Sequence, residues 1–115
     1  MIILDTLEYS FADELAVGFS YDSEGKRISI TFESYYKNNQ YVEKKCTLTI
    51  ESWTEGESKM HGQEKYGELE SNLGIPSLLL GVDQSESMVV LTINTLDDRY
   101  LVLRFVGAHI KVNDV

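Results

Sequence analysis

The residues able to do chemistry in this chain of 115 amino acids are one cysteine, two histidines and a surplus of carboxylates. Cys46 shares one face of a predicted strand with Leu48 and Ile50, which predicts a buried and inert thiol. His61 and His109 have no partner at the spacing of a zinc ligand set, and neither Cys-x-x-Cys nor His-Glu-x-x-His occurs. We therefore expect no nucleophile and no zinc site.

The acidic residues near chain reversals also lack the pattern of a cation site. Asp97 and Asp98 stand in a predicted turn, where their side chains would cap nearby backbone groups. Asp83 and Glu86 lack the Asp-x-Asp-x-Asp-Gly order of a calcium loop, and the glycines form no phosphate loop. Because no base, nucleophile or metal constellation is visible, we predict that the protein is not an enzyme and uses no metal or other cofactor.

Tyrosines are better candidates, and the chemistry that suits them is binding. Tyr35, Tyr36 and Tyr41 flank one polar turn. Because neighbours in a strand point to opposite faces, Tyr35 or Tyr36 must face away from the core. Tyrosine buries a large area with little loss of rotamer entropy and keeps a hydroxyl for hydrogen bonding, as interfaces favour. The alternative is that these rings only cover the end of a sheet.

Glutamates concentrate in residues 54–72, a segment without hydrophobic periodicity. Its length predicts a functional loop with a brief helix within residues 63–71. Such a loop would carry negative charge free of any role in the core, beside the tyrosine turn. The predicted partner-binding residues are Tyr35, Tyr36, Tyr41, Glu51, Glu55, Glu57, Glu64, Glu68 and Glu70.

The charge balance limits the possible partners. The chain has 19 acidic and 10 basic residues, with a formal net charge of −9. This balance disfavours a nucleic-acid surface, because phosphate binding needs clustered Lys and Arg. A basic protein is the natural complement, although an acidic balance also serves solubility alone.

The length indicates a single domain over residues 1–115. One cysteine forms no internal disulfide, and the first residues lack the basic and apolar regions of a signal peptide, so we expect a cytoplasmic protein. We expect no membrane association, because the longest apolar run, residues 75–82, is strand-sized and interrupted by Pro76 and Gly81.

An antiparallel sheet is expected to position these residues. Residues 88–106 give the clearest hairpin signal, two alternating apolar runs hinged at residues 96–99. Their second faces mix polar and apolar residues, which predicts a central place in a sheet. Residues 17–21 and 26–35 predict another hairpin, whose turn contains Gly25 as the residue suited to a positive φ.

Further strands are expected over residues 2–4, 41–53, 75–82 and 108–112. The strand over 41–53 should pair with that over 26–35 and leave Trp53 to close the edge of the core. Six to eight strands with at most one short helix predict an all-β fold, an antiparallel meander that forms a β-sandwich or a flattened barrel. The predicted core residues are Phe19, Ile28, Ile30, Phe32, Leu48, Ile50, Leu91, Ile93, Leu101, Leu103 and Phe105.

Three short segments carry a resemblance to a known class of proteins. They are Phe11-Ala12-Asp13-Glu14-Leu15, Ile28-Ser29-Ile30-Thr31-Phe32 and Cys46-Thr47-Leu48-Thr49-Ile50. In strand pattern, acidity and size, most of the chain resembles the bacterial immunity proteins of polymorphic-toxin and contact-dependent growth-inhibition systems. The resemblance implies a stoichiometric inhibitor that binds a cognate toxin domain, often a nuclease, inside the cell that makes it.

Three hypotheses from different classes of function remain. They are an immunity protein, a β-barrel or other interaction domain that holds a small ligand or another partner, and an enzyme with an unrecognised site. The inward Ile, Leu and Phe residues predict an interior filled by its own side chains, which disfavours the ligand-holding barrel. We favour the inhibitor, which needs only a surface, and expect its acidic face to occlude the active site of a basic toxin.

Overall fold

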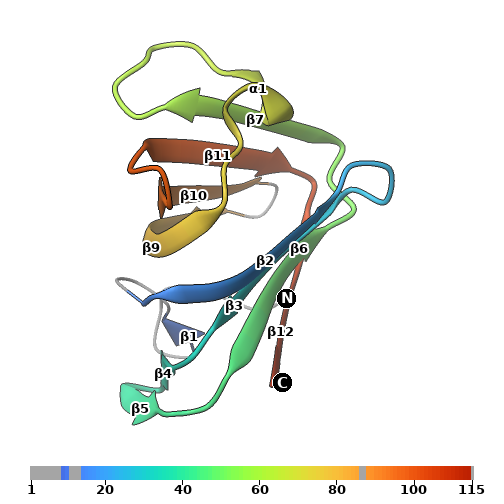
Figure 1. Cartoon of the computed structure of the whole chain (residues 1–115). Helices are drawn as coiled ribbons and strands as arrows, with labels where there is room; N and C mark the ends of the chain where they lie inside the picture. Colours follow the sequence, from blue (N-terminus) through green and yellow to red (C-terminus); the bar gives the residue numbers. More distant parts are fainter. Residues whose placement is uncertain (1–8, 11–13, 86–87, 115) are drawn as a thin grey trace.

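The computed structural model describes residues 9–10, 14–85 and 88–114. These residues form twelve strands and one short helix in three antiparallel sheets (Figure 1). The predicted all-β class is confirmed, and the predicted number of strands is too low. The strand expected over residues 2–4 lies outside the described residues, as do residues 11–13 and Glu86.

The five-stranded sheet has the order β8-β7-β11-β10-β9. Its members are β7 (Glu55–Met60), β8 (Gly67–Glu68), β9 (Pro76–Gln84), β10 (Met88–Thr95) and β11 (Tyr100–Val106). The hairpin predicted over residues 88–106 is present and lies in the interior of this sheet, with Ile93 opposite Leu101. Strand β9 begins at Pro76 and forms one edge, as predicted, because proline cannot donate to a central ladder.

The four-stranded sheet has the order β12-β6-β3-β2. Its members are β2 (Ala16–Asp22), β3 (Arg27–Phe32), β6 (Cys46–Glu51) and β12 (His109–Asp114). The predicted β2–β3 hairpin and the pairing of β6 with β3 are confirmed. The positive φ in the hairpin turn falls at Lys26, not at Gly25 as predicted. Gly25 instead allows the Asp22 carboxylate to lie close to the backbone of the turn, because a Cβ at position 25 would be 2.5 Å from Asp22 Oδ2.

A small third sheet contains β1 (Tyr9–Ser10), β4 (Tyr35–Lys37) and β5 (Gln40–Val42). Asn38 and Asn39 both have positive φ, which matches the tight hairpin turn that residues of this type favour. The single strand predicted over residues 41–53 is thus divided between β5 and β6. Helix α1 (Leu69–Asn72) is the one helix among the described residues, and none there is long and apolar enough to cross a membrane.

The two larger sheets pack face to face around one hydrophobic core (Figure 1). Every predicted core residue is buried except Phe19, which is partly buried because it lies on the edge strand β2. Cys46 is buried, as predicted. Further buried members of the core are Tyr35, Trp53, Leu69, Leu79, Val89 and Ile110.

Both large sheets continue into each other at one corner of the domain. The chain passes from β6 to β7 through Ser52, which has a positive φ, and from β11 to β12 through Gly107, which also has a positive φ. The two crossings are joined by a hydrogen bond of 2.8 Å from the Thr54 N–H to the Val106 carbonyl. Trp53 fills the corner, its ring centroid 4.7 Å from that of Phe105, and so closes the core edge as predicted.

Candidate binding surface

The glutamate-rich segment folds as part of the sheet, so the prediction of a loop over residues 54–72 is wrong. Strand β7 pairs along its length with β11, and only residues 61–66 form a turn before β8 and α1. This strand shows no apolar alternation in the sequence because two of its three inward positions are Gly56 and Ser58, and only the third, Met60, is apolar. The predicted brief helix is present, at residues 69–72.

A buried hydroxyl attaches β8 and α1 to β7. The Ser58 side chain is 0% exposed, and its Oγ donates to the carbonyls of Glu68 at 3.0 Å and Leu69 at 2.9 Å. The Asn72 amide in turn lies 3.3 Å from Ser58 Oγ. Ser58 therefore fixes the position of the carboxylates that follow on β8 and α1.

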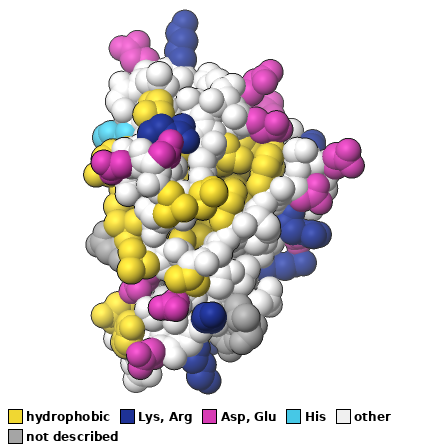
Figure 2. Space-filling model, viewed as in Figure 1, with side chains coloured by type: hydrophobic (Ala, Val, Ile, Leu, Met, Phe, Trp, Pro, Cys, Tyr) yellow, Lys and Arg dark blue, Asp and Glu magenta, His cyan; other side chains and the backbone are white. Residues whose placement is uncertain are grey.

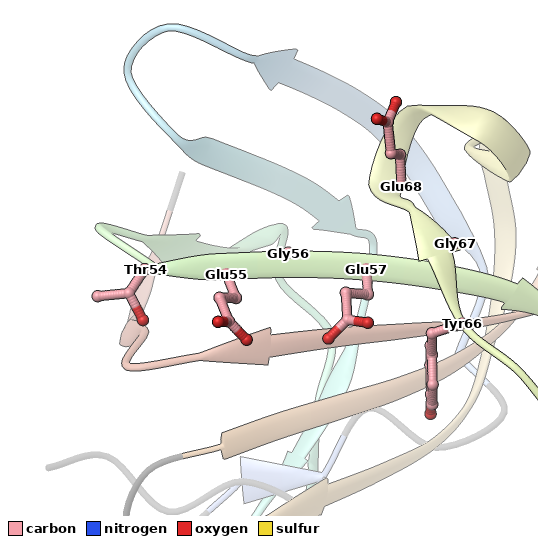
Figure 3. Close-up of a pocket in the computed structure, with 7 residues that line it drawn as sticks. All are labelled: Thr54, Glu55, Gly56, Glu57, Tyr66, Gly67 and Glu68. Atoms are coloured by element: carbon pink, nitrogen blue, oxygen red, sulfur yellow. The ribbon is translucent and has the colours of Figure 1, made fainter.

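A shallow, open hollow of about 620 Å³ lies along β7 (Figure 3). The side chains of Glu55, Glu57 and Tyr66 point to the same side of β7, whereas the Glu68 carboxylate points the opposite way (Figure 3). The complete lining is Thr54, Glu55, Gly56, Glu57, Tyr66, Gly67 and Glu68. Carboxylates therefore dominate the charge of the hollow.

The three glutamates of this hollow differ in how they are neutralised. Glu57 Oε1 accepts a hydrogen bond of 2.8 Å from Arg104 Nη2, and the Arg104 guanidinium lies 3.9 Å from the centroid of the Tyr66 ring. Glu55 and Glu68 have no ion-pair partner within the described part of the chain. Glu57 is thus paired with Arg104, whereas Glu55 and Glu68 are not paired with any cation of the described residues.

A second hollow of about 300 Å³ lies on the other side of β7 and shares Gly56 and Glu68 with the first. Trp53 and Leu69 form its apolar wall, and α1 and the turn between β2 and β3 form its rim. The complete lining is Tyr21, Ser23, Lys26, Trp53, Gly56, Glu68, Leu69 and Glu70. Asp and Glu side chains gather around α1 and this turn (Figure 2).

Tyr21 and Glu70 close one end of the second hollow. The Tyr21 hydroxyl donates a hydrogen bond of 3.0 Å to Glu70 Oε1. Burial, followed by this hydrogen bond and the charge of Glu70, raises the pKa of Tyr21 to about 12. The tyrosine therefore stays a neutral donor at physiological pH and holds the Glu70 carboxylate at the rim.

Glu51 and Glu64 do not line either hollow. Glu51 lies on the four-stranded sheet, where it forms ion pairs with Lys111 at 2.6 Å and Arg27 at 3.1 Å. The hydrogen bond from Lys111, and then that from Arg27, lowers the pKa of Glu51. Glu64 is exposed in the turn between β7 and β8.

The predicted tyrosines lie far from the acidic hollows. Tyr35 is buried, 5% exposed, and belongs to the core, whereas Tyr36 is 44% and Tyr41 55% exposed. The exposed rings pack on each other with centroids 5.4 Å apart. Their hairpin, β4–β5, lies at the opposite end of the molecule from β7 and α1 (Figure 1). The single surface predicted from the sequence is therefore two separate surfaces.

The remaining candidates for chemistry have structural roles or are exposed. Asp97 accepts hydrogen bonds from the side chains of Thr95 and Arg99, in addition to a backbone hydrogen bond of the kind predicted for this turn. His61 and His109 are exposed. No group of three or more His, Cys, Asp and Glu residues that could hold a metal occurs in the described ranges.

The sequence did not indicate that Tyr21, Trp53 and Tyr66 line the two hollows. Their positions depend on tertiary structure, since Tyr21 comes from the opposite sheet and meets Glu70 49 positions later in the chain. Comparisons with protein-family models, with curated proteins and with solved structures found no match to this chain.

Proposed function

We propose that this protein is a cytoplasmic immunity protein that binds and neutralises a cognate bacterial toxin domain of basic character, such as a nuclease. The observation that carries the proposal is that Glu55 on β7 and Glu68 on β8, beside two hollows, have no ion-pair partner among the described residues. Such groups attract a basic partner over long range and pair with its cations on contact.

Inhibition in this proposal is by occlusion. The carboxylates of Glu55, Glu68 and Glu70 would occupy positions on the toxin that otherwise receive anionic substrate groups. No covalent step, metal or cofactor is required. Tyr66 and Trp53 supply aromatic surface beside these charges, as is common where interfaces concentrate their binding energy.

The packed interior supports this proposal over a ligand-holding barrel. Eleven large side chains in the core are less than 2% exposed, among them Phe32, Leu91 and Phe105. They fill the space between the sheets that a small apolar ligand would need. The hollows beside the acidic residues lie on the surface instead, where a protein partner can reach them.

The test uses the toxic carboxy-terminal domain of the large secreted protein expected from the neighbouring gene. Its association with this protein should be followed by stopped-flow mixing at several salt concentrations. We expect the association rate to fall steeply as salt rises while the dissociation rate changes little, and inhibition to be complete at one equivalent. An association rate insensitive to salt, or complete inhibition by much less than one equivalent, would contradict the proposal.

A further inference from the structure

Strand β7 has an edge that is only partly covered. On one side it pairs with β11 from Glu55 to Met60. On the other side it pairs with β8 at only two positions, Glu57 and Ser58. No strand among the described residues covers this second edge at Glu55 and Gly56. Because alternate residues of a strand present their N–H and C=O groups to a given edge, one of these two residues presents both groups outward.

The uncovered edge is flanked by a hollow on each face of the sheet. The first hollow places Glu55 and Glu57 on one face, and the second places Trp53 and Leu69 on the other. Gly56 is common to both. A Cβ at position 56 would lie 3.0 Å from Trp53 Nε1 and 3.2 Å from Leu69 Cδ2, so these two side chains reach the strand itself.

We propose that an extended, basic segment of the protein partner adds to the five-stranded sheet at this edge, in line with β8. The proposal rests on the proposed function and states how the partner docks. Backbone hydrogen bonds to Glu55 or Gly56 would supply part of the affinity, as in other cases of strand addition. Strand β8 ends after two residues and the chain continues as α1, so no strand of the described residues pairs with β7 at Glu55 and Gly56.

The two hollows set the side chains that the segment should carry. Successive side chains of a strand point to opposite faces, so one set enters the first hollow and the other set the second. Lys or Arg suits the face with Glu55, and an aliphatic side chain suits the face with Trp53 and Leu69. A second copy of this chain is a poor occupant, because each copy carries a net charge of −9.

The probe is the peptide acetyl-Lys-Val-Lys-Val-Lys-Val-amide, titrated into the full chain at low salt. We expect it to bind and to slow hydrogen exchange at the amide of Glu55 or Gly56, measured by NMR. Two further peptides carry backbone N-methyl groups on all lysines or on all valines, with unchanged charge. One of the two should lose affinity at least tenfold and the other should bind like the parent, because only alternate N–H groups face β7.

Chain variants separate strand addition from simple charge attraction. Glu55→Gln should weaken peptide binding, and Glu43→Gln, at an exposed position remote from β7, is the matched control for loss of one charge. Binding that is equally insensitive to both N-methyl patterns would overturn strand addition and leave the acidic-surface proposal intact. Failure of the parent peptide to bind, while the basic toxin domain binds with the expected salt dependence, would also overturn it.

Discussion

The Tyr21 hydroxyl donates a hydrogen bond to Glu70 Oε1 at 3.0 Å, and this contact joins β2 of one sheet to α1 beside the other. Because the folded-state pKa of Tyr21 is raised to about 12, the folded chain keeps this proton at a pH where the unfolded chain has released it. The contribution is complete below about pH 10 and is lost as pH rises towards 12. We expect the stability of Tyr21→Phe to fall less steeply than that of the wild type between about pH 10 and 12 in denaturant titrations. An unchanged slope would contradict the assignment.

Glu51 gives the opposite pH dependence. Its lowered pKa means that its ion pairs stabilise the folded state above the ordinary glutamate pKa, and that this contribution is lost as pH falls through the folded value. Carboxyl NMR titration should show Glu51 ionising below the ordinary glutamate pKa. Lys111→Met should raise the pKa of Glu51 more than Arg27→Met does, because the hydrogen bond from Lys111 is the larger cause.

Ser58→Ala should destabilise the attachment of β8 and α1. The substitution leaves the carbonyls of Glu68 and Leu69 without their buried donor, at a cost of about 1–3 kcal/mol in the free energy of unfolding. Ser29→Ala is the control, since it removes one hydroxyl from the partly buried Ser29–Thr49 pair and should cost about 1 kcal/mol or less. Urea denaturation measures both, and equal losses would count against the anchoring role of Ser58.

Glu57→Gln and Glu55→Gln each remove one negative charge from β7, but only the first breaks an ion pair. The Arg104 Nε atom is buried and has no hydrogen-bond partner within the described residues, so the guanidinium depends on Glu57 through Nη2. We expect Glu57→Gln to cost about 0.5–1 kcal/mol and Glu55→Gln to leave stability nearly unchanged. Thermal unfolding of the two variants side by side provides the comparison. Equal stability would show that the pair contributes nothing measurable.

Tyr35 and Tyr36 are neighbours with opposite roles. Tyr35→Ala should cost about 3–5 kcal/mol, as large-to-small changes of buried aromatic residues do, because its ring lies in the core. Tyr36→Ala should change stability by less than about 1 kcal/mol, since its ring is largely on the surface and packs on Tyr41. If the proposed toxin partner binds only at the β7 end, Tyr36→Ala will also leave the affinity for it unchanged.

The strands with apolar residues at every second position were predictable from the sequence. Strand β10 alternates Val89, Leu91 and Ile93 on its inner face, and this period alone specified its type and its hairpin with β11. Strand β7 was not predictable in this way. Its inner positions are Gly56, Ser58 and Met60, of which only the last is apolar. The strand exists because β11 offers a paired edge and because Trp53 and Leu69 fill the space beside the glycine.

The negative charge of the candidate surface was predictable from the sequence, but the set of residues that form it was not. The density of glutamates predicted an acidic segment, and three of these glutamates, Glu55, Glu68 and Glu70, line the two hollows. Composition did not reveal that Glu51 and Glu57 are neutralised, since their cations come from Lys111 and Arg104, remote in the chain. The prediction combined the tyrosine hairpin and the acidic segment in one surface only because the two are near each other in the sequence.

The corner at Trp53 and Gly107 has a consequence for folding kinetics. Strand β6 is followed by β7, and β11 by β12, and the two stretches pair with each other as one bent ribbon. The β7–β11 half lies in the five-stranded sheet and the β6–β12 half in the four-stranded sheet. Neither sheet is complete without pairings between distant parts of the chain, which must pay the entropy of closing a long loop. We therefore expect one cooperative unfolding transition and slow folding. The local hairpins β2–β3 and β10–β11 should form early, before the long-range pairings of the ribbon.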